Sequence, residues 1–255
     1  MNAFSASPAS RCTALAALAL AVAPLPAAAQ ERVAQFELGL GVKAAPAYEG
    51  SDEYKAGPSL GGSLDALSIG SINIQPGDDL GFGIAPSFRY LSERTASDHK
   101  ILTGINDVDA AFELGAKVSY RWQGTEVFAA MRRGVTGHDG IVLDLGADAI
   151  LQPAERTTVR IGPRVSLANE AYMDTYFSVP GTATNLAPYD ADGGVKSYGL
   201  EMTVRQDLSD TWAIEGSLGY DRLSGQAGDS PIAKAGSRDQ GTIGIMLIRK
   251  FNLRF

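Results

Sequence analysis

Two histidines are the residues of this chain best suited to acid–base chemistry. His99 lies in the charged run Ser97–Lys100, and His138 lies in the glycine-flanked segment Gly137–Gly140. A hydrolase would need such a histidine beside an acid and a serine nucleophile. Alternate side chains of an extended chain point apart, so the serine and the aspartate that precede His99 do not readily converge on it. His138 is better explained by a turn whose glycine takes a backbone conformation that other residues avoid. We therefore predict that the protein is not an enzyme.

Metal and cofactor chemistry find little support in the sequence. The acids show no metal-loop spacing, and the single cysteine, Cys12, lies in an N-terminal segment that we expect to be removed. We therefore expect no metal site and no cofactor. With 22 basic and 29 acidic residues the net charge is −7. Nucleic acid phosphates would repel such a chain, so nucleic acid is not an expected partner.

Charged residues with regular spacing form the strongest candidate site. A hairpin centred on Ala154 would set Asp148 opposite Arg160 and Asp144 opposite Arg164. All four side chains would then point to the polar face of the two strands. Cross-strand ion pairs of this kind contribute about 0.2–1 kcal/mol each.

The same reasoning extends the charge pattern to neighbouring hairpins. A turn at Gln123–Gly124 would set Arg121 opposite Glu126, and Arg205 would lie diagonal to Glu215 across the turn at 208–210. We call the six residues Arg121, Glu126, Asp144, Asp148, Arg160 and Arg164 the lumenal charge ladder. Its favoured interpretation is structural, a set of ion pairs that fills the inside of a small barrel. A solute-selective channel is the alternative.

The elements that would position these charges are strands, because hydrophobicity alternates with a period of two. In the clearest segment Leu80, Phe82, Ile84, Pro86, Phe88 and Tyr90 alternate with small or polar residues. The segments reach the length of about 9–11 residues that a tilted strand needs to cross a membrane. Ten segments follow the pattern, near residues 33–47, 54–74, 80–91, 110–122, 125–135, 140–151, 157–168, 194–207, 211–223 and 241–255.

This pattern predicts an all-β fold, a transmembrane antiparallel up-and-down β-barrel of about ten strands. Twelve is the alternative count, because Gly61–Gly62 could break the long segment 54–74. A soluble β-sandwich also alternates, but the segment lengths and the end of the chain argue against it. Pro58, Pro86 and Pro163 fall inside predicted strands, where proline is disfavoured, and bulges are the expected explanation.

The two ends of the chain carry export and assembly signals. Arg11, an apolar run and the small residues before Gln30 predict a secretory signal peptide over 1–29, which leaves a barrel domain over 30–255 and a net charge of −8. The last strand alternates up to Phe255 and resembles the C-terminal assembly signal of outer-membrane barrels. Phe251 and Leu253 belong to the same signal, although Leu253 stands where an aromatic residue is usual.

Several local strings resemble the MltA-interacting protein (MipA/OmpV) family of outer-membrane proteins. They occur in family order over most of the chain: Pro46–Ser51, Leu102–Gly104, His138–Gly140, Ala171–Tyr172, Tyr176–Val179, Tyr189, Gly193–Gly194, Trp212 and Gly228–Ile232. Gln226 stands where the family pattern leads us to expect an acid. The resemblance implies an outer-membrane barrel, in one member a scaffold that joins a lytic transglycosylase to a bifunctional peptidoglycan synthase.

These observations together predict a non-enzymatic scaffold or binding protein of the cell envelope. Its expected location is the outer membrane, and its expected contacts are outer-membrane lipid and, through the resemblance, peptidoglycan enzymes. A narrow channel for small solutes is the second hypothesis. A membrane-embedded hydrolase is the third, and it requires a serine or an acid within hydrogen-bonding reach of His99 or His138. The sequence leaves the oligomeric state open.

Overall fold

A computed structural model describes residues 33–69, 72–74 and 80–254. The chain divides into two compact units, Met1–Gln30 and Glu31–Phe255, and only the second contains described residues. The predicted signal peptide over 1–29 and the terminal Phe255 lie outside them. Within the described part the protein is all-β, as the alternation of the sequence predicts.

Ten long antiparallel strands and one short strand make up the described sheet. The strands are β1 (Val33–Pro46), β2 (Tyr54–Ile69), β3 (Ile72–Ile74), β4 (Gly81–Leu91), β5 (Ala111–Trp122), β6 (Thr125–Gly134), β7 (Ile141–Ala154), β8 (Thr157–Ala168), β9 (Gly194–Asp207), β10 (Trp212–Leu223) and β11 (Asp239–Arg254). The count of ten long strands is thus confirmed. Gly61 and Gly62 do not break β2, since both stay paired with β1.

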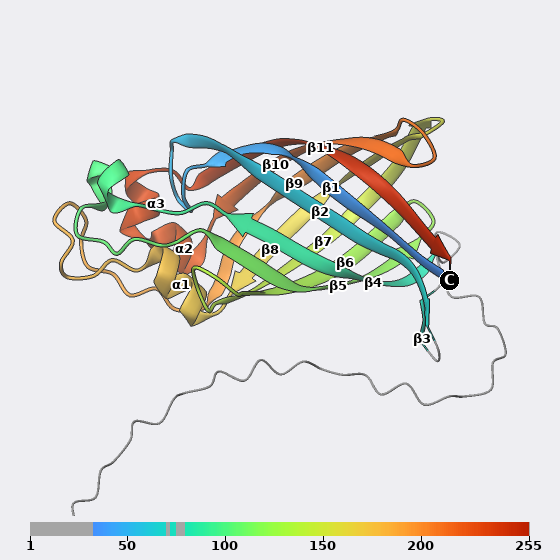
Figure 1. The fold of residues 1–255 in the computed structure, drawn as a ribbon. Helices are drawn as coiled ribbons and strands as arrows, with labels where there is room; N and C mark the ends of the chain where they lie inside the picture. The colour runs from blue at the N-terminus through green and yellow to red at the C-terminus, as the bar shows by residue number, and fades with distance from the viewer. Residues whose placement is uncertain (1–32, 70–71, 75–79, 255) are drawn as a thin grey trace, which may run out of the picture. The chain divides into compact units, whose positions relative to one another are not determined.

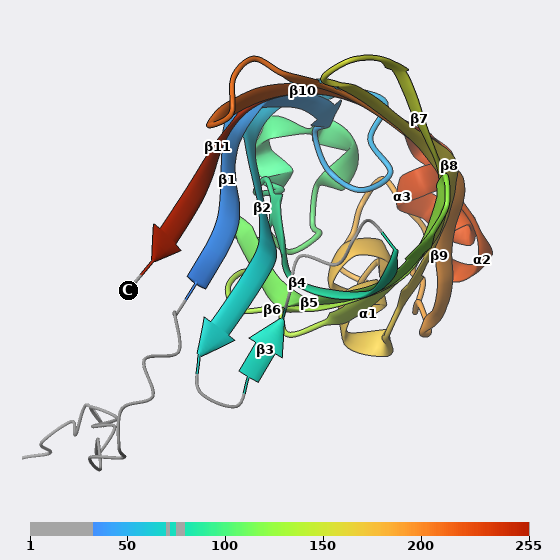
Figure 2. The same cartoon turned by 90° about the vertical axis from the view of Figure 1, so that its right-hand side faces the viewer.

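The sheet curls until its two edges lie side by side (Figures 1 and 2). Its strand order is β3-β2-β1-β11-β10-β9-β8-β7-β6-β5-β4. The first and last long strands, β1 and β11, are therefore neighbours inside the sheet. The pairing of β1 with β11 runs from Val33↔Arg254 to Ala44↔Ile243. The edge strands of this order are β3 and β4, and β2, which pairs with β3 only over Leu67–Ile69, lies close to β4. Among the described residues no backbone pairing joins β2 to β4. We call the line between these two strands the seam.

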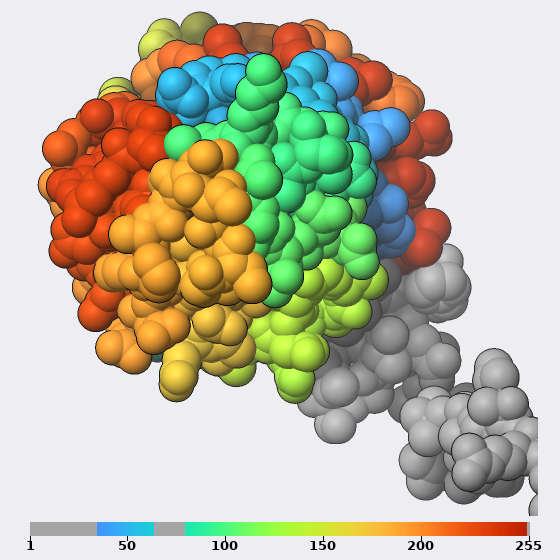
Figure 3. Space-filling model, turned by 90° about the vertical axis from the view of Figure 1, so that its left-hand side faces the viewer, coloured from blue at the N-terminus to red at the C-terminus, as the bar shows by residue number. Residues whose placement is uncertain are grey.

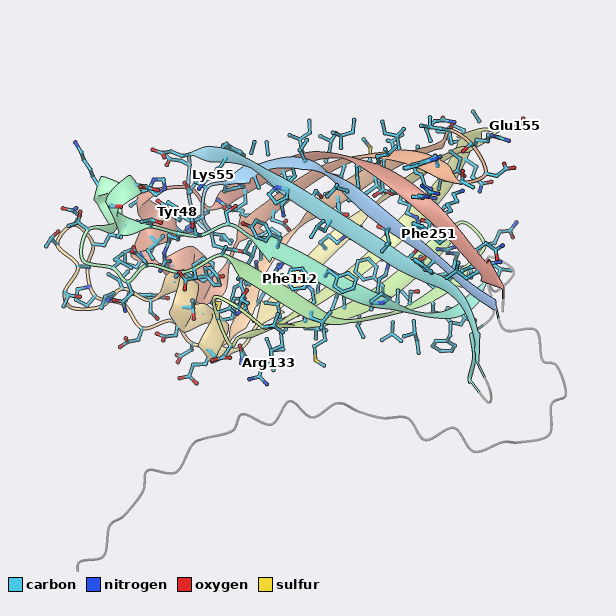
Figure 4. All side chains as sticks on the ribbon, viewed as in Figure 1. Tyr48, Lys55, Phe112, Arg133, Glu155 and Phe251 are labelled. Carbon is cyan, nitrogen blue, oxygen red and sulfur yellow. The ribbon has the colours of Figure 1, made fainter. Side chains whose placement is uncertain are left out.

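The outer face of the sheet is apolar and the inner face is polar. Large apolar side chains cover the outside along whole strands, for example Leu38, Leu40 and Val42 on β1 (Figure 4). Phe82 on β4 is 87% exposed. Exposed apolar residues of this size and number are typical of a surface that contacts lipid. Charged and small residues alternate with them and face inward, which places the polar groups in the lumen.

The prolines inside the strands find a partial explanation in the sheet order. Pro58 lies on β2 outside its pairing with β3, and Pro86 lies on β4, so both have a partner strand on one side only, where a sheet tolerates proline. Pro163 lies on the central strand β8. The register shifts occur at other positions, so the expected bulges at these prolines are not observed. We have no physical account of Pro163.

The two ends of the curled sheet differ in their connections. One end carries the first and last described residues, Val33 and Arg254, and short turns such as that at Gln123–Gly124 (Figure 1). We call it the short-turn end. The other end carries the long loops, and we call their assembly the cap. The cap contains η1 (Ala96–Asp98), η2 (Lys100–Leu102), α1 (Glu170–Phe177), α2 (Gly225–Asp229) and α3 (Pro231–Ala235). None of the helices among the described residues is long and apolar enough to cross a membrane.

The cap has a hydrophobic core of its own. Tyr172, Met173 and Phe177 of α1 are fully buried, and they pack with residues of β7, β10 and α2. A second cluster around Leu102 and Ile232 joins η2 to α3 and to the loop between β1 and β2. Asn169 begins α1, and its side chain accepts a hydrogen bond from the Tyr172 backbone amide. Packed segments from these loops cover this end of the sheet (Figure 3).

Candidate functional site

A polar cavity occupies the inside of the curled sheet. Its volume is about 1030 Å³, and its lining extends from Gly81 and Arg121 near the short-turn end to Lys43 and Lys196 beneath the cap. Basic and acidic side chains line it in nearly equal number. Ion pairs with good geometry offset part of the cost of removing charges from water. The lumen is the candidate site, and its charges include two clusters, each around one buried glutamate.

The first cluster surrounds Glu126 on β6, near the short-turn end. Arg121 lies opposite Glu126 in the β5–β6 register, as predicted, and the two side chains form an ion pair of 2.6 Å. Lys117 lies 2.9 Å from the same carboxylate, and Arg160 lies 3.0 Å from it. The Glu126 side chain is only 3% exposed. The Glu126 carboxylate thus forms ion pairs with three cations, and both of its oxygens take part.

The predicted pairs of the β7–β8 hairpin are wrong by two residues. The register sets Arg164 opposite Gly146 and Arg160 opposite Ile150, because an irregularity after Leu151 moves the turn toward Arg156. The face of each side chain is kept, since a shift of two preserves the alternation. Asp148 consequently pairs diagonally with Arg164 at 2.7 Å instead of with Arg160.

The other predicted pairs change in the same way. Asp144 binds Arg132 of β6 instead of Arg164. Arg205 lies directly opposite Glu215 and not diagonal to it. Its guanidinium nevertheless donates two hydrogen bonds of 2.7 Å to Glu37 of β1. Inward charges therefore pair across several strands, and a single hairpin does not determine their partners.

The second cluster surrounds Glu113 on β5, beneath the cap. The Glu113 side chain is 0% exposed and accepts hydrogen bonds of 2.7 and 2.8 Å from Arg89. Arg132 donates a third bond of 3.3 Å. His138 Nε2 lies 3.2 Å from the carboxylate, while its Nδ1 accepts a hydrogen bond from the Gly140 backbone amide. Because Nδ1 is an acceptor, the ring proton belongs on Nε2, which faces Glu113.

Glu49 connects this cluster to the cap. It lies in the loop between β1 and β2, where Lys196 Nζ contacts its two oxygens at 2.9 and 3.2 Å. The Tyr172 hydroxyl of α1 donates a bond of 2.9 Å to the same carboxylate. Burial alone would raise the pKa of Glu49, but attraction to Lys196 and Arg89 and these hydrogen bonds lower it on balance. Burial, with the nearby Glu49 charge, raises the pKa of Tyr172 well above its usual value.

His99 takes part in a different set of contacts. Its Nδ1 lies 3.1 Å from Glu53, and its ring meets the edge of Tyr48, with both partners in the loop between β1 and β2. Ser97 Oγ donates a weak bond of 3.5 Å to its neighbour Asp98. The residues around His99 thus join two loops of the cap. Among the residues that the structure describes, no group of three or more His, Cys, Asp or Glu side chains is arranged to hold a metal ion.

The cluster around Glu113 was not identified by sequence reasoning. Alternation alone places Arg89, Glu113 and Arg132 on the polar face of their strands. A long loop separates β4 from β5, so no short turn fixes which of these positions are level with each other. His138 adds a side chain from a loop, which no strand pattern can position. The useful signal was the shared inward face of the three strand residues.

The last strand is paired on both sides. Phe251 stacks on Phe36 of β1 with ring centroids 4.9 Å apart, and Leu253 is 42% exposed on the outer face. Arg249 lies over the rings of Phe251 and Trp212 at 5.3 and 5.1 Å. Phe255 lies outside the described residues, so its contribution to the assembly signal stays a prediction.

A curled antiparallel sheet with an apolar outer face, a charged lumen and short turns at one end is an outer-membrane β-barrel protein. Residues 38–251 match the family model described as MltA-interacting protein MipA. The chain therefore belongs to the MipA family, and the sequence-based identification is confirmed.

Comparisons with other proteins add little to this identification. No curated protein matches the sequence significantly. Among solved structures, the Neisserial surface protein A (NspA) is similar at 10% identity and a TM-score of 0.35, covering 85% of this chain and 97% of that chain. The outer membrane protein H (OprH) from P. aeruginosa is similar at 15% identity and a TM-score of 0.35, covering 84% and 99%. These scores are too low to support an inference about function.

Proposed function

We propose that this protein is a non-enzymatic scaffold of the outer membrane that binds peptidoglycan enzymes. The family name supports an interaction with a lytic transglycosylase, and the resemblance adds a bifunctional peptidoglycan synthase. The proposal rests on one observation: the buried lumenal carboxylates are already paired with cations of the same protein. Glu113 and Glu126 each hold two or more cations at hydrogen-bonding distance. The lumenal ion pairs thus make the barrel rigid, and the exposed turns are the surfaces that bind the enzymes.

The short-turn end is the surface that we assign to these partners. In outer-membrane barrels the short turns face the periplasm, where peptidoglycan lies. The turn between β9 and β10 carries Asp210, which is 95% exposed and lies 3.5 Å from Arg156. A comparable pair at the opposite end is Asp139 with Arg133, at 3.9 Å and with Asp139 90% exposed. These two exposed acids make a matched pair for mutation.

The experiment measures binding of the purified transglycosylase and synthase of the same cell to the barrel in nanodiscs. Asp210→Arg should weaken binding, whereas Asp139→Arg should leave it unchanged. Partner binding that neither substitution alters would place the interface elsewhere. Absence of binding by both enzymes to the wild-type barrel would end the scaffold proposal.

A narrow channel is the second candidate, and the cavity of about 1030 Å³ favours it. The cap opposes it, because buried side chains of α1 and α3 close one end. Single-channel recordings in planar bilayers distinguish the two functions. A large steady conductance of the wild-type protein would move the channel to first place. We expect none.

The hydrolase hypothesis has one observation in its favour, the acid beside His138. Glu113 is nonetheless unsuited to act as a base, because both of its oxygens accept hydrogen bonds from Arg89. Its side chain has no exposed surface, so substrate has no access to it. We infer that Glu113 and His138 hold the cap on the barrel. Hydrolysis of a lipid or peptide ester that His138→Ala abolishes in the folded protein would refute this role.

Export is proposed on the N-terminal pattern alone. The chain should lose residues 1–29 and begin at Gln30 in the envelope. N-terminal sequencing of protein extracted from the outer membrane tests the cleavage site. Retention of Met1 would contradict the proposed signal peptide.

A further inference from the structure

Arg249 is a cation on the apolar outer face of the barrel, on β11 near the short-turn end. Its neighbour Ile248 is 6% exposed and lines the lumenal cavity, so Arg249 faces outward. In the register Arg249 lies between Leu38 of β1 and Trp212 of β10. These two side chains also face outward, and they are 53% and 36% exposed. Arg249 therefore carries its charge on the face that contacts lipid.

The contacts of Arg249 are with aromatic rings. Its guanidinium carbon lies 5.1 Å from the ring centroid of Trp212 and 5.3 Å from that of Phe251. Among the described residues no carboxylate or carbonyl accepts a hydrogen bond from it. Every other arginine whose side chain is described in a strand lies 3.9 Å or less from a carboxylate. A guanidinium has five N–H donors, and a ring face attracts its charge without replacing acceptor oxygens.

The two rings hold the guanidinium in place. Phe251 lies at this end of β11 (Figure 4), and its ring stacks on Phe36 of β1 at 4.9 Å with an interplanar angle of 12°. Trp212 approaches from the other side, on β10. Arg249 is thus restrained by rings from its own strand and from a neighbouring strand. A group that is ordered before its ligand arrives loses less conformational entropy on binding.

The tryptophans set the level of Arg249 in the membrane. Tryptophan is enriched at the boundary between hydrocarbon and water. Trp122 ends β5 and Trp212 begins β10, so both lie beside short turns, which face the periplasm in outer-membrane barrels. Arg249 is level with Trp212 in the register. An arginine on the lipid face is costly at the midplane and tolerated near the interface. Arg249 therefore lies at the level of the phospholipid head groups.

An apolar strip leads from Arg249 toward the middle of the membrane. On the outer face of β11 it consists of Leu247, Ile245 and Ile243, all of them about half exposed. A lipid whose phosphate meets Arg249 can lay its acyl chains along this strip. Its head group is then at the periplasmic end and its chains point toward the bilayer centre. This is the orientation of a phospholipid in the periplasmic leaflet.

We propose that Arg249, with Trp212 and Phe251, forms a binding site for an anionic phospholipid of the periplasmic leaflet. The lipid phosphate accepts hydrogen bonds from the guanidinium, whose planar fork matches two phosphate oxygens. The net negative charge of the head group balances the cation, whereas a zwitterionic head group adds an amine that Arg249 repels. This inference goes beyond the scaffold function and does not depend on it.

Native mass spectrometry of the full barrel in detergent micelles tests the site. The probes are phosphatidylglycerol and phosphatidylcholine with identical acyl chains, and the measured quantity is the dissociation constant of the tightest lipid-binding step. The wild-type protein should bind phosphatidylglycerol more tightly than phosphatidylcholine. Arg249→Gln should weaken phosphatidylglycerol binding about tenfold, as expected for the loss of hydrogen bonds to a charged group.

Arg222 supplies the matched control. It lies at the cap end of β10 on the same outer face, and its guanidinium already forms an ion pair of 2.6 Å with Asp239. Arg222→Gln removes the same charge and should leave phosphatidylglycerol binding unchanged. Arg249→Lys keeps the charge but loses the fork, so its affinity should fall between those of the wild type and Arg249→Gln. If Arg249→Gln lacks the heat-modifiable mobility of a folded barrel, Arg249→Lys decides.

Three results would overturn the proposal. Equal affinity of the wild type for the two lipids would show that no anionic head group is selected. Equal losses in Arg249→Gln and Arg222→Gln would show that only the overall charge matters. If Arg249→Gln left lipid binding intact but weakened binding of the purified transglycosylase, Arg249 would belong to a protein interface instead.

Discussion

A double-mutant cycle on Asp148 and Arg164 measures the ion pair that the register creates. The two side chains are 5% and 14% exposed, and their contact is 2.7 Å. Hydrogen bonds to charged groups contribute about 1.5–3 kcal/mol. Arg164 also reaches Glu201 at 3.5 Å and the carbonyl of Pro163 at 3.1 Å, so it keeps part of its stabilisation when Asp148 is neutralised. We therefore expect a coupling free energy of about 1–2 kcal/mol between Asp148→Asn and Arg164→Gln.

The matched control is the cycle on Asp148 and Arg160. Arg160 is the other diagonal neighbour of Asp148, but its guanidinium binds Glu126 at 3.0 Å. Its coupling to Asp148 should stay below about 0.5 kcal/mol. Free energies of unfolding come from urea titration of the barrel in lipid vesicles, followed by heat-modifiable gel mobility. A larger coupling for Asp148 with Arg160 than with Arg164 would refute the register and restore the hairpin centred on Ala154.

Three further predictions follow from single residues. Glu126→Gln should lower the free energy of unfolding by about 3 kcal/mol. This is the lower end of the range for a broken buried ion pair, because the three cations around Glu126 keep some contact with water. The control Asp139→Asn, whose side chain is 90% exposed, should change the same free energy by less than about 0.5 kcal/mol. The pKa of Glu49 is lower in the folded than in the unfolded protein, so its ionised carboxylate stabilises the folded state above the unfolded pKa, and this stabilisation is lost as pH falls through the folded pKa. Protease cleavage of the cap should therefore rise on acidification. Glu49→Gln should flatten that pH profile. An unchanged profile would assign the acid sensitivity to another group. Deleting Phe255 should reduce the folded yield in cells, and an unchanged yield would leave Phe251 as the residue to test.

The strands were predictable because their alternation is long and regular. Observed boundaries differ from the expected ones by a few residues, apart from the segment 54–74, which divides into β2 and β3. The Arg121–Glu126 pair was predictable too, since a two-residue turn fixes its register. The next hairpin was displaced because the pairing is irregular between Leu151 and Ala154, and Pro153 within this stretch marks a break without fixing how far the turn moves.

The cap and the seam were not predictable from local patterns. The cap depends on contacts between residues far apart in sequence, such as Tyr172 with Glu49. The prolines at 58 and 86 were visible as exceptions to strand composition, but their explanation required the order of the strands. A proline in a predicted membrane strand is therefore a useful indication of an edge, and Pro163 on a central strand shows the limit of that rule.

The strand order also has a consequence for folding. Apart from the join of β1 with β11, every long pairing in the sheet connects strands that are consecutive along the chain. Hairpins between consecutive strands close short loops and form quickly, whereas the join of the chain ends must close a loop of nearly the whole domain. Strand pairing in the sheet thus has a single long-range join, that of β1 with β11. Linking the two ends and opening the chain between β3 and β4 would turn the fold into an uninterrupted meander with only local pairings.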